Sequence, residues 1–201
     1  MQNAHHSLFQ LPDKFMKTCL FLIDAQESFR QRPYYTATDL PAFVAAQNAL
    51  IDGCIAKGVP IVRVLHVDGP KTASNPFALE SGCVQPLTEL HAFEPAATFF
   101  KSRHSALVGT GLDVWLTEHG IQKLIISGIR TEQCCETTTR HASDLGWQVD
   151  YCLEATLTWD MQHLDGSVLK AADIKARTAA VLTDRFATIC SPAQALARAV
   201  A

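Results

Sequence analysis

The sequence predicts an α/β fold in which a mostly parallel sheet is flanked by helices on both faces. Short apolar runs alternate with helical patterns along the chain, and each run is continuously apolar. Continuous apolar strands are typical of parallel sheets that are buried on both faces, and the intervening helices supply the covering layers. The length of 201 residues is that of one domain, so we treat residues 1–201 as a single domain.

The amino-terminal part of the chain predicts an irregular arm, a buried strand and a helix. Residues 1–17 lack any hydrophobic period, and His5 and His6 in this arm receive no role. The run TCLFLIDAQ indicates a strand that ends at Asp24. A helix over residues 39–58 follows, with apolar residues at helical spacing, an aspartate before it and a glycine at its end.

Further strands and helices alternate around one long loop. The run PIVRVLHV is a second strand, and the proline-rich residues 69–96 form a long irregular excursion, which in a compact domain is usually functional. A short extended piece then reaches Lys101, and a helix after it ends at Gly120. The remaining elements are a strand at 122–129, a helix at 133–145, a strand at 148–155, a helix at 167–186 and a strand at 187–190.

Composition and charge exclude several classes of function. The formal net charge is -3 and the sequence pI is 6.2, which provides no basic surface for nucleic acid. The apolar run CLFLI near the start is interrupted by Asp24, and no segment approaches the length of a membrane span. We therefore expect a cytoplasmic protein that binds neither nucleic acid nor membrane.

The seven cysteines do not form a recognisable disulfide or zinc pattern. None belongs to a C-x-x-C sequence or to a zinc spacing with histidine. Four lie within apolar patterns, where free cysteine behaves as a small hydrophobic residue. These four, which we expect to be reduced and buried, are Cys19, Cys54, Cys152 and Cys190.

Asp24, Lys101 and Cys134 stand at or just after the ends of predicted strands, where open parallel sheets bind ligands. Each alone has a structural explanation, as a turn cap, a solvated charge or a core residue. Together they supply the groups that hydrolysis of an amide requires. A thiol at a helix start and a nearby cation favour the thiolate, and a carboxylate can accept its proton and later protonate a leaving amine. The turn GIRTEQC also offers backbone N–H groups to an oxyanion.

Three motifs surround these residues. LFLIDAQESF is similar to a D-x-Q-x-x-F pattern, KSRHSALVGTGLDVWLTEHGI contains the lysine segment, and LIISGIRTEQCCETTTRHASDLG contains a cysteine signature. In this order they resemble the isochorismatase-like cysteine hydrolases, the superfamily that includes N-carbamoylsarcosine amidase and nicotinamidase. The resemblance covers residues 17–190, and three motifs in the family's order make it specific.

The resemblance implies a six-stranded parallel sheet and a catalytic triad of Asp24, Lys101 and Cys134. In the family pattern the cysteine attacks a carbonyl carbon, the aspartate shuttles the proton, and the lysine lowers the pKa of the thiol. The resemblance also implies a non-proline cis peptide bond at Ile129–Arg130, with the backbone N–H groups of Arg130 and Cys134 as oxyanion donors. It implies no cofactor.

The chain departs from the family pattern at two places. The nicotinamidase branch binds metal through a D-x-H-x-x-x-H pattern, whereas HVDGPKTASNPF offers His66 and Asp68 without a later histidine at that spacing. We therefore expect no metal, and nicotinamide becomes a less favoured substrate. Cys135 replaces the family's usual valine and begins a helical stripe that we expect to face the sheet. The stripe consists of Cys135, Thr138, Thr139, Ala142 and Leu145.

Four residues are the candidates for substrate binding. Phe29 matches the family's pocket aromatic and Trp159 follows a strand, with packing under a loop as the alternative for both. His66 ends the second strand, and a satisfied loop histidine is its alternative. Thr131 matches the motif threonine, whose expected job is to hold the turn.

Two further side chains near the motifs have open roles. Arg130 occupies a variable position of the motif, where its side chain either meets an anionic substrate or points outward. His104 follows the motif lysine by three residues, and we expect it to be structural or peripheral. Neither side chain is therefore included among the predicted substrate-binding groups.

The predicted function is cleavage of a C–N bond in a small amide, ureido or carbamoyl compound through a covalent acyl-enzyme on Cys134. Vinyl-ether hydrolysis of the isochorismatase type is the nearest alternative, and its known members need no cysteine. A non-catalytic small-molecule binding protein and a redox protein are the others. Adjacent residues on a helix point about 100° apart, which argues against a redox pair of Cys134 and Cys135. The resemblance also implies a homo-oligomer, a dimer or larger.

Overall fold

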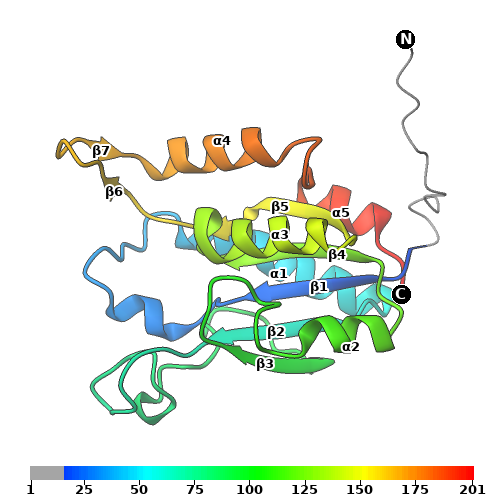
Figure 1. Ribbon diagram of the computed structural model, residues 1–201, viewed down its shortest axis with the longest axis horizontal. Coiled ribbons are helices and arrows are strands. Elements are labelled where there is room, and N and C mark those ends of the chain that lie inside the picture. Colours follow the sequence, from blue (N-terminus) through cyan, green and yellow to red (C-terminus); the bar gives the residue numbers. More distant parts are fainter. Residues whose placement is uncertain (1–15) are drawn as a thin grey trace.

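Six parallel strands form the centre of the molecule in the order β3-β2-β1-β4-β5-β8 (Figure 1). The computed structural model describes residues 16–201, so His5, His6 and most of the predicted arm lie outside the described residues. Every pairing between neighbouring strands of this sheet is parallel, which confirms the predicted sheet. The strands are β1 (Thr18–Ile23), β2 (Ile61–His66), β3 (Ala97–Lys101), β4 (Lys123–Ile129), β5 (Gln148–Leu157) and β8 (Thr188–Cys190).

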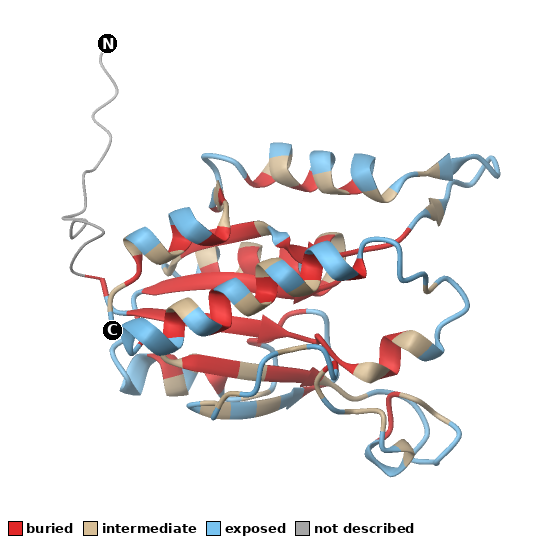
Figure 2. Cartoon of the chain, turned by 180° about the vertical axis from the view of Figure 1, so that it is seen from behind, coloured by how far each residue is buried: buried red, intermediate tan, exposed pale blue. Residues whose placement is uncertain are grey.

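Helices cover both faces of the sheet, as the sequence predicts (Figure 1). On one face α1 and α5 pack on the strands, and on the other face α2, α3 and α4 do so. Figure 2 shows buried strands enclosed by helices whose outer sides are exposed. The helices are α1 (Leu40–Lys57), α2 (Leu112–Glu118), α3 (Glu136–Asp144), α4 (Ala171–Leu182) and α5 (Pro192–Arg198).

The continuous apolar strands are explained by burial on both sides of the sheet. All six residues of β1 are buried, and successive side chains point to opposite faces. Phe21 belongs to the same apolar cluster as Leu112 of α2, whereas Leu20 belongs to the cluster that contains Leu50 of α1. Each β1 side chain therefore has a helical layer to pack against.

The carboxyl-terminal third differs from the prediction in two elements. The helix expected over residues 167–186 is limited to α4, because a small hairpin of β6 (Met161–Gln162) and β7 (Val168–Leu169) occupies the chain before it. Asp160 fixes the start of α4, since its Oδ1 accepts a hydrogen bond of 2.9 Å from the Ala171 N–H. Helix α5 was not predicted because its apolar stripe is short.

The connections otherwise follow the predicted order. Residues 69–96 are irregular except for a 3-10 turn at Leu79–Ser81, and another 3-10 turn follows β1 at Glu27–Gln31. Asp39 precedes α1, but its side chain makes no capping hydrogen bond there. Among the described residues, no helix is both long enough and apolar enough to cross a membrane.

Candidate active site

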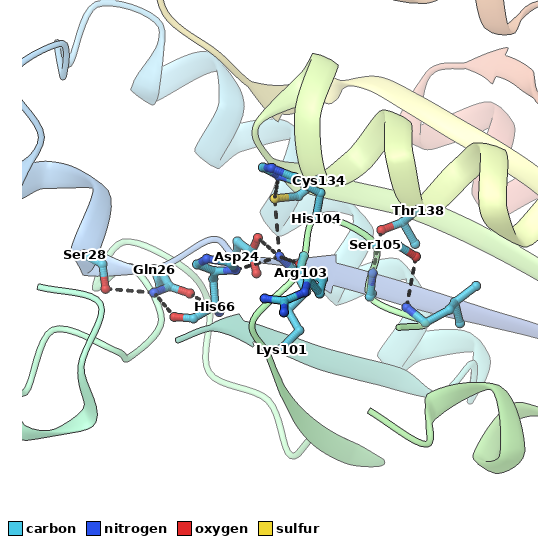
Figure 3. A network of polar contacts seen from close by, with 12 residues as sticks. Asp24, Gln26, Ser28, His66, Lys101, Arg103, His104, Ser105, Cys134 and Thr138 are labelled. Carbon is cyan, nitrogen blue, oxygen red and sulfur yellow. Dashed lines mark hydrogen bonds and ion pairs between the residues drawn. The ribbon is translucent and has the colours of Figure 1, made fainter. Parts of the chain in front are cut away.

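The three strand-end residues meet at the carboxyl edge of the sheet (Figure 3). Lys101 Nζ lies 2.7 Å from Asp24 Oδ2 and 3.3 Å from Cys134 Sγ. Their exposed fractions are 0% for Asp24, 1% for Lys101 and 6% for Cys134, so the contacts are shielded from water. Because β2 separates β3 from β1, the long lysine side chain reaches past the end of β2 to join the other two groups.

The chain leaves β1 sharply at Asp24. This residue has a φ of 51°, in the left-handed region, which aspartate tolerates better than most residues. Its backbone N–H donates a hydrogen bond of 2.8 Å to the carbonyl of Val64. The turn therefore directs the Asp24 carboxylate along the edge of the sheet toward the end of β3.

An irregular strand-to-helix junction carries Cys134. The Ile129–Arg130 peptide bond is cis, at the position that the family resemblance implied. Thr131–Cys135 then form one turn of π-helix before α3, a feature often found at functional sites. Gly128 has a φ of 127°, and an ideal Cβ built on it would lie 1.9 Å from the carbonyl oxygen of Ile23. Only glycine permits this approach of β1 and β4.

Burial controls the protonation of the site. It raises the pKa of the Cys134 thiol to about 12, with a further rise from Asp24 and an opposing effect of Lys101. Burial also raises the pKa of the Asp24 carboxyl, although Lys101 acts against it. Burial lowers the pKa of Lys101, but the charges of Asp24 and Cys134 outweigh it and leave this pKa raised. Lys101 thus acts on the pKa of the thiol in the expected direction, but burial outweighs it and leaves this pKa raised.

His66 also contacts Lys101. Its Nδ1 lies 3.1 Å from Lys101 Nζ, and because an ammonium can only donate, Nδ1 accepts and Nε2 carries the proton. Burial lowers the pKa of His66 to about 4, and the charge of Lys101 adds to this effect, so the ring is neutral near pH 7.

Gln26 fixes the backbone of His66, a role that the sequence reasoning missed. The Gln26 Oε1 accepts a hydrogen bond of 2.7 Å from the His66 N–H, and its Nε2 donates to the His66 carbonyl at 3.1 Å. The side chain is fully buried. The available signal was the glutamine of the D-x-Q-x-x-F pattern, which lies two residues after Asp24.

Phe29 and Trp159 belong to an aromatic cluster beside His66. The two rings stack with centroids 5.8 Å apart, and Tyr34 lies 5.4 Å from Trp159. Phe77 connects the cluster to the site, with centroids 5.2 Å from Phe29 and 5.7 Å from His66. Both predicted aromatics are buried, so they pack under a loop, and Phe77 is the ring through which the cluster contacts His66.

The side chains of Arg130 and Thr131 are buried and make their contacts within the protein. Arg130 does not point outward, because it is buried, lies 3.1 Å from Glu132 Oε1 and places its guanidinium 4.9 Å from the Tyr34 ring. Thr131 is fully buried and donates a hydrogen bond of 2.8 Å to Thr156 Oγ1. Thr131 therefore holds the turn, and its inclusion among the substrate-binding residues is not supported by this geometry.

His104, expected to be structural or peripheral, instead contacts the thiol. Its Nδ1 lies 3.8 Å from Cys134 Sγ. Figure 3 shows the imidazole on one side of the sulfur, with Lys101 and Asp24 on the other. A lone histidine in an irregular segment carries no periodicity that indicates its direction, and its spacing from Lys101 was the available signal.

The remaining cysteines and the predicted stripe are mostly buried. All seven cysteines are free thiols, and the four expected in the core are buried. Cys135 is fully buried, as predicted, but Leu145 at the end of the stripe is 52% exposed, so that part of the prediction is wrong. Over residues 16–201, no group of three or more histidine, cysteine or acidic side chains is arranged to hold a metal ion.

Fold and site together define a class of protein, a three-layer α/β/α hydrolase domain with its polar site beyond the carboxyl edge of the sheet. Within that class the chain belongs to the isochorismatase family, because the isochorismatase domain matches residues 18–184. It is therefore a single-domain hydrolase of that family.

Individual relatives cover most of the chain at low identity. The uncharacterized isochorismatase family protein YrdC of Bacillus subtilis is 26% identical over 183 residues, which are 89% of this chain and 94% of that protein. The nicotinamidase of Escherichia coli is 26% identical over 188 residues, 74% of this chain and 86% of that protein. The crystal structure of an isochorismatase from Pseudomonas putida aligns with a TM-score of 0.79 at 29% identity, covering 88% and 89% of the two chains.

Proposed function

We propose that the protein is a cysteine hydrolase that cleaves the C–N bond of a small amide, ureido or carbamoyl compound. The observation that carries the proposal is the 3.3 Å contact of Cys134 Sγ with Lys101 Nζ, which is itself paired with Asp24 at 2.7 Å. These groups supply a nucleophile, a proton acceptor and a cation within one buried cluster. The similarity to a nicotinamidase supports an amide as the bond that is cleaved.

In the proposed reaction Cys134 Sγ attacks the carbonyl carbon while its proton moves to the Asp24 carboxylate. The C–N bond then breaks, the amine leaves with an added proton, and a thioester remains on the sulfur. Water attacks the thioester, the C–S bond breaks, and the sulfur regains a proton. Because the pKa of the free thiol is raised to about 12, transfer of its proton to Asp24 accompanies the attack.

The negative charge that develops on the substrate carbonyl oxygen during the attack needs hydrogen-bond donors. The proposed donors lie at the junction after β4. The backbone N–H groups of Arg130 and Cys134 are the proposed donors, since Arg130 precedes the π-helical turn and Cys134 lies within it. Lys101 keeps the Asp24 carboxylate beside the thiol and offsets the negative charge that moves between them. The lysine thus orients the pair and does not itself react.

The proposed substrate is small and partly planar. Phe29 and Trp159 stack in an aromatic cluster that reaches His66 through Phe77, and the Nε2 proton of His66 can donate to a substrate carbonyl or carboxylate. A vinyl-ether hydrolase is the second candidate, favoured by the structural similarity to an isochorismatase. The buried thiol between lysine and histidine favours the amide reaction, because an ether hydrolysis makes no use of a sulfur nucleophile.

The adjacent cysteines provide the test and its matched control. We expect Cys134→Ala to lower the rate of ammonia release on the best compound of an amide and ureide panel by a factor on the order of 10⁴ or more. Cys135→Ala removes a thiol that only packs in the core, so it should keep the wild-type kcat. Full turnover by Cys134→Ala would disprove the nucleophile, and release of ammonia from no compound would favour the ether hydrolase.

A further inference from the structure

His104 approaches the nucleophile from the solvent side. Its Nδ1 is 3.8 Å from Cys134 Sγ, and its side chain is exposed. The Asp24 carboxyl lies on the opposite side of the sulfur, and neither of its oxygens is accessible to solvent (Figure 3). The sulfur therefore lies between the Asp24 carboxyl, which is closed to solvent, and the His104 imidazole, which is exposed.

The fold holds His104 in this place. On one side of it in the chain, the Arg103 carbonyl accepts a hydrogen bond of 3.1 Å from Lys101 Nζ. On the other side, Ser105 Oγ lies 2.9 Å from Nδ1 of His141, which belongs to α3. The residues on both sides of His104 are thus attached, one to the catalytic lysine and the other to the helix that follows the nucleophile.

Amide hydrolysis requires two kinds of proton transfer. One proton leaves the sulfur when it attacks and returns to the sulfur when the thioester breaks. A second is given to the leaving amine and is later taken from the attacking water. A general acid or base must lie within hydrogen-bond reach of the atom it serves. Asp24 is held near the sulfur because Lys101 Nζ contacts both groups, whereas His104 lies at the solvent-exposed side of the sulfur, from which an amine or a water molecule can be reached.

We propose that Asp24 and His104 divide these transfers, so that His104 is a second catalytic residue of the proposed amide hydrolysis, on which this inference depends. In acylation the S–C bond forms as the thiol proton passes to Asp24, and the C–N bond breaks as protonated His104 gives a proton to the amine. In deacylation His104 takes a proton from water as the O–C bond forms. The C–S bond then breaks, and Asp24 returns its proton to the sulfur.

Two substrates with the same acyl group separate the two roles. One is the best carboxamide of the panel, and the other is the p-nitrophenyl ester of the same acid, whose leaving group needs no proton. We expect His104→Gln to slow ammonia release from the amide by about 100-fold or more. The same variant should still release about one nitrophenolate per chain in a rapid burst, followed by slow turnover of the thioester.

Two variants complete the experiment. Asp24→Asn should lose the nitrophenolate burst as well, because the sulfur then lacks its proton acceptor. His163→Gln, a change of an exposed histidine in the turn between β6 and β7, should behave as wild type with both substrates. The burst itself reports a folded site in His104→Gln.

Three outcomes would overturn the inference. Wild-type amide turnover by His104→Gln would remove its catalytic role, and loss of the ester burst in that variant would show a role in positioning the thiol. If the wild-type protein gives an ester burst but releases ammonia from no amide, the proposed function itself fails and the division of transfers fails with it.

Discussion

The sheet contains two buried lysine–aspartate pairs, one at each edge. At the carboxyl edge Lys101 Nζ lies 2.7 Å from Asp24, and both side chains are fully buried. At the amino edge Lys123 Nζ lies 3.4 Å from Asp150, and these side chains are 2% and 3% exposed. Residue types and burial are almost the same, yet only one pair belongs to the candidate active site.

The difference lies in what else contacts each carboxylate and each lysine. Asp150 accepts hydrogen bonds from Arg198 at 2.8 and 3.4 Å, so two cations meet one carboxylate. Asp24 pairs with Lys101, and that lysine also contacts a thiol. A buried ion pair therefore does not by itself indicate a reactive site. What distinguishes the candidate active site is a lysine that contacts both a carboxylate and a thiol.

The largest expected effect is a difference in activity between the Asp24→Asn and Asp150→Asn variants. Asp24→Asn should lower kcat for the amide by about 10²- to 10⁴-fold, because the thiol loses the group that accepts its proton. Asp150→Asn should leave kcat of the folded protein unchanged. Ammonia release per folded chain, with the folded fraction taken from circular dichroism, is the measurement. Equal losses in both variants would contradict the comparison.

The next effect separates them by stability. Asp150→Asn should lower the free energy of unfolding by about 3–5 kcal/mol, since it removes a buried carboxylate that the buried Lys123 and the partly exposed Arg198 both contact. Asp24→Asn should cost less, because the Asp24 carboxylate pairs with one cation, Lys101, rather than with two. Urea unfolding of both variants checks the order, and a greater loss in Asp24→Asn would show that the fully buried pair contributes more to stability.

The pKa of the Cys134 thiol tests the proposed effects of Asp24 and Lys101 on the sulfur. Asp24 raises the pKa of Cys134 and Lys101 lowers it, so Asp24→Asn should bring this pKa below about 12. Lys101→Met should shift it in the opposite direction. The pH dependence of alkylation by iodoacetamide reports the midpoint, with Cys134→Ala as the blank. A midpoint that does not move in Asp24→Asn would exclude the assumed repulsion between the carboxylate and the thiolate.

The smallest effect concerns the acidic side of the pH–rate profile. Asp24 accepts a proton only when ionised, and burial raises its pKa above the ordinary value of 3.8. The rate should therefore rise with pH at a midpoint above that of an ordinary carboxyl group. The profile of kcat/KM for the amide, measured within the range in which the protein stays folded, tests this sign. A midpoint at or below the ordinary value would show that Lys101 outweighs burial.

The sequence predicted the carboxyl-edge cluster because its members lie at or just after strand ends. Parallel strands bring such positions together, so Asp24, Lys101 and Cys134 could be associated without knowledge of any side-chain contact. The same reasoning placed Cys135 in the core from its helical spacing. These inferences depend on periodicity and strand direction, which are local properties of the sequence.

Other features depend on contacts that no local pattern encodes. The contact of His104 with the sulfur follows from the path of an irregular segment. The π-helical turn at Thr131–Cys135 makes the helical region begin before residue 133, where the helix was predicted to start. The raised pKa of the Cys134 thiol reflects burial and the nearby Asp24 carboxylate, which are properties of the assembled core. The amino-edge pair was also missed, because its charges lie inside strands that otherwise have apolar patterns.

The close approach at Gly128 has a consequence for how such a protein can diversify. The missing Cβ sets the distance between β1, which leads to Asp24, and β4, which leads to Cys134, since any larger residue would collide with Ile23. Substitution at this position cannot fine-tune the distance and can only disrupt it. Adaptation to new compounds would therefore fall to the loops and the aromatic cluster around the candidate site, while the spacing of β1 and β4 stays fixed.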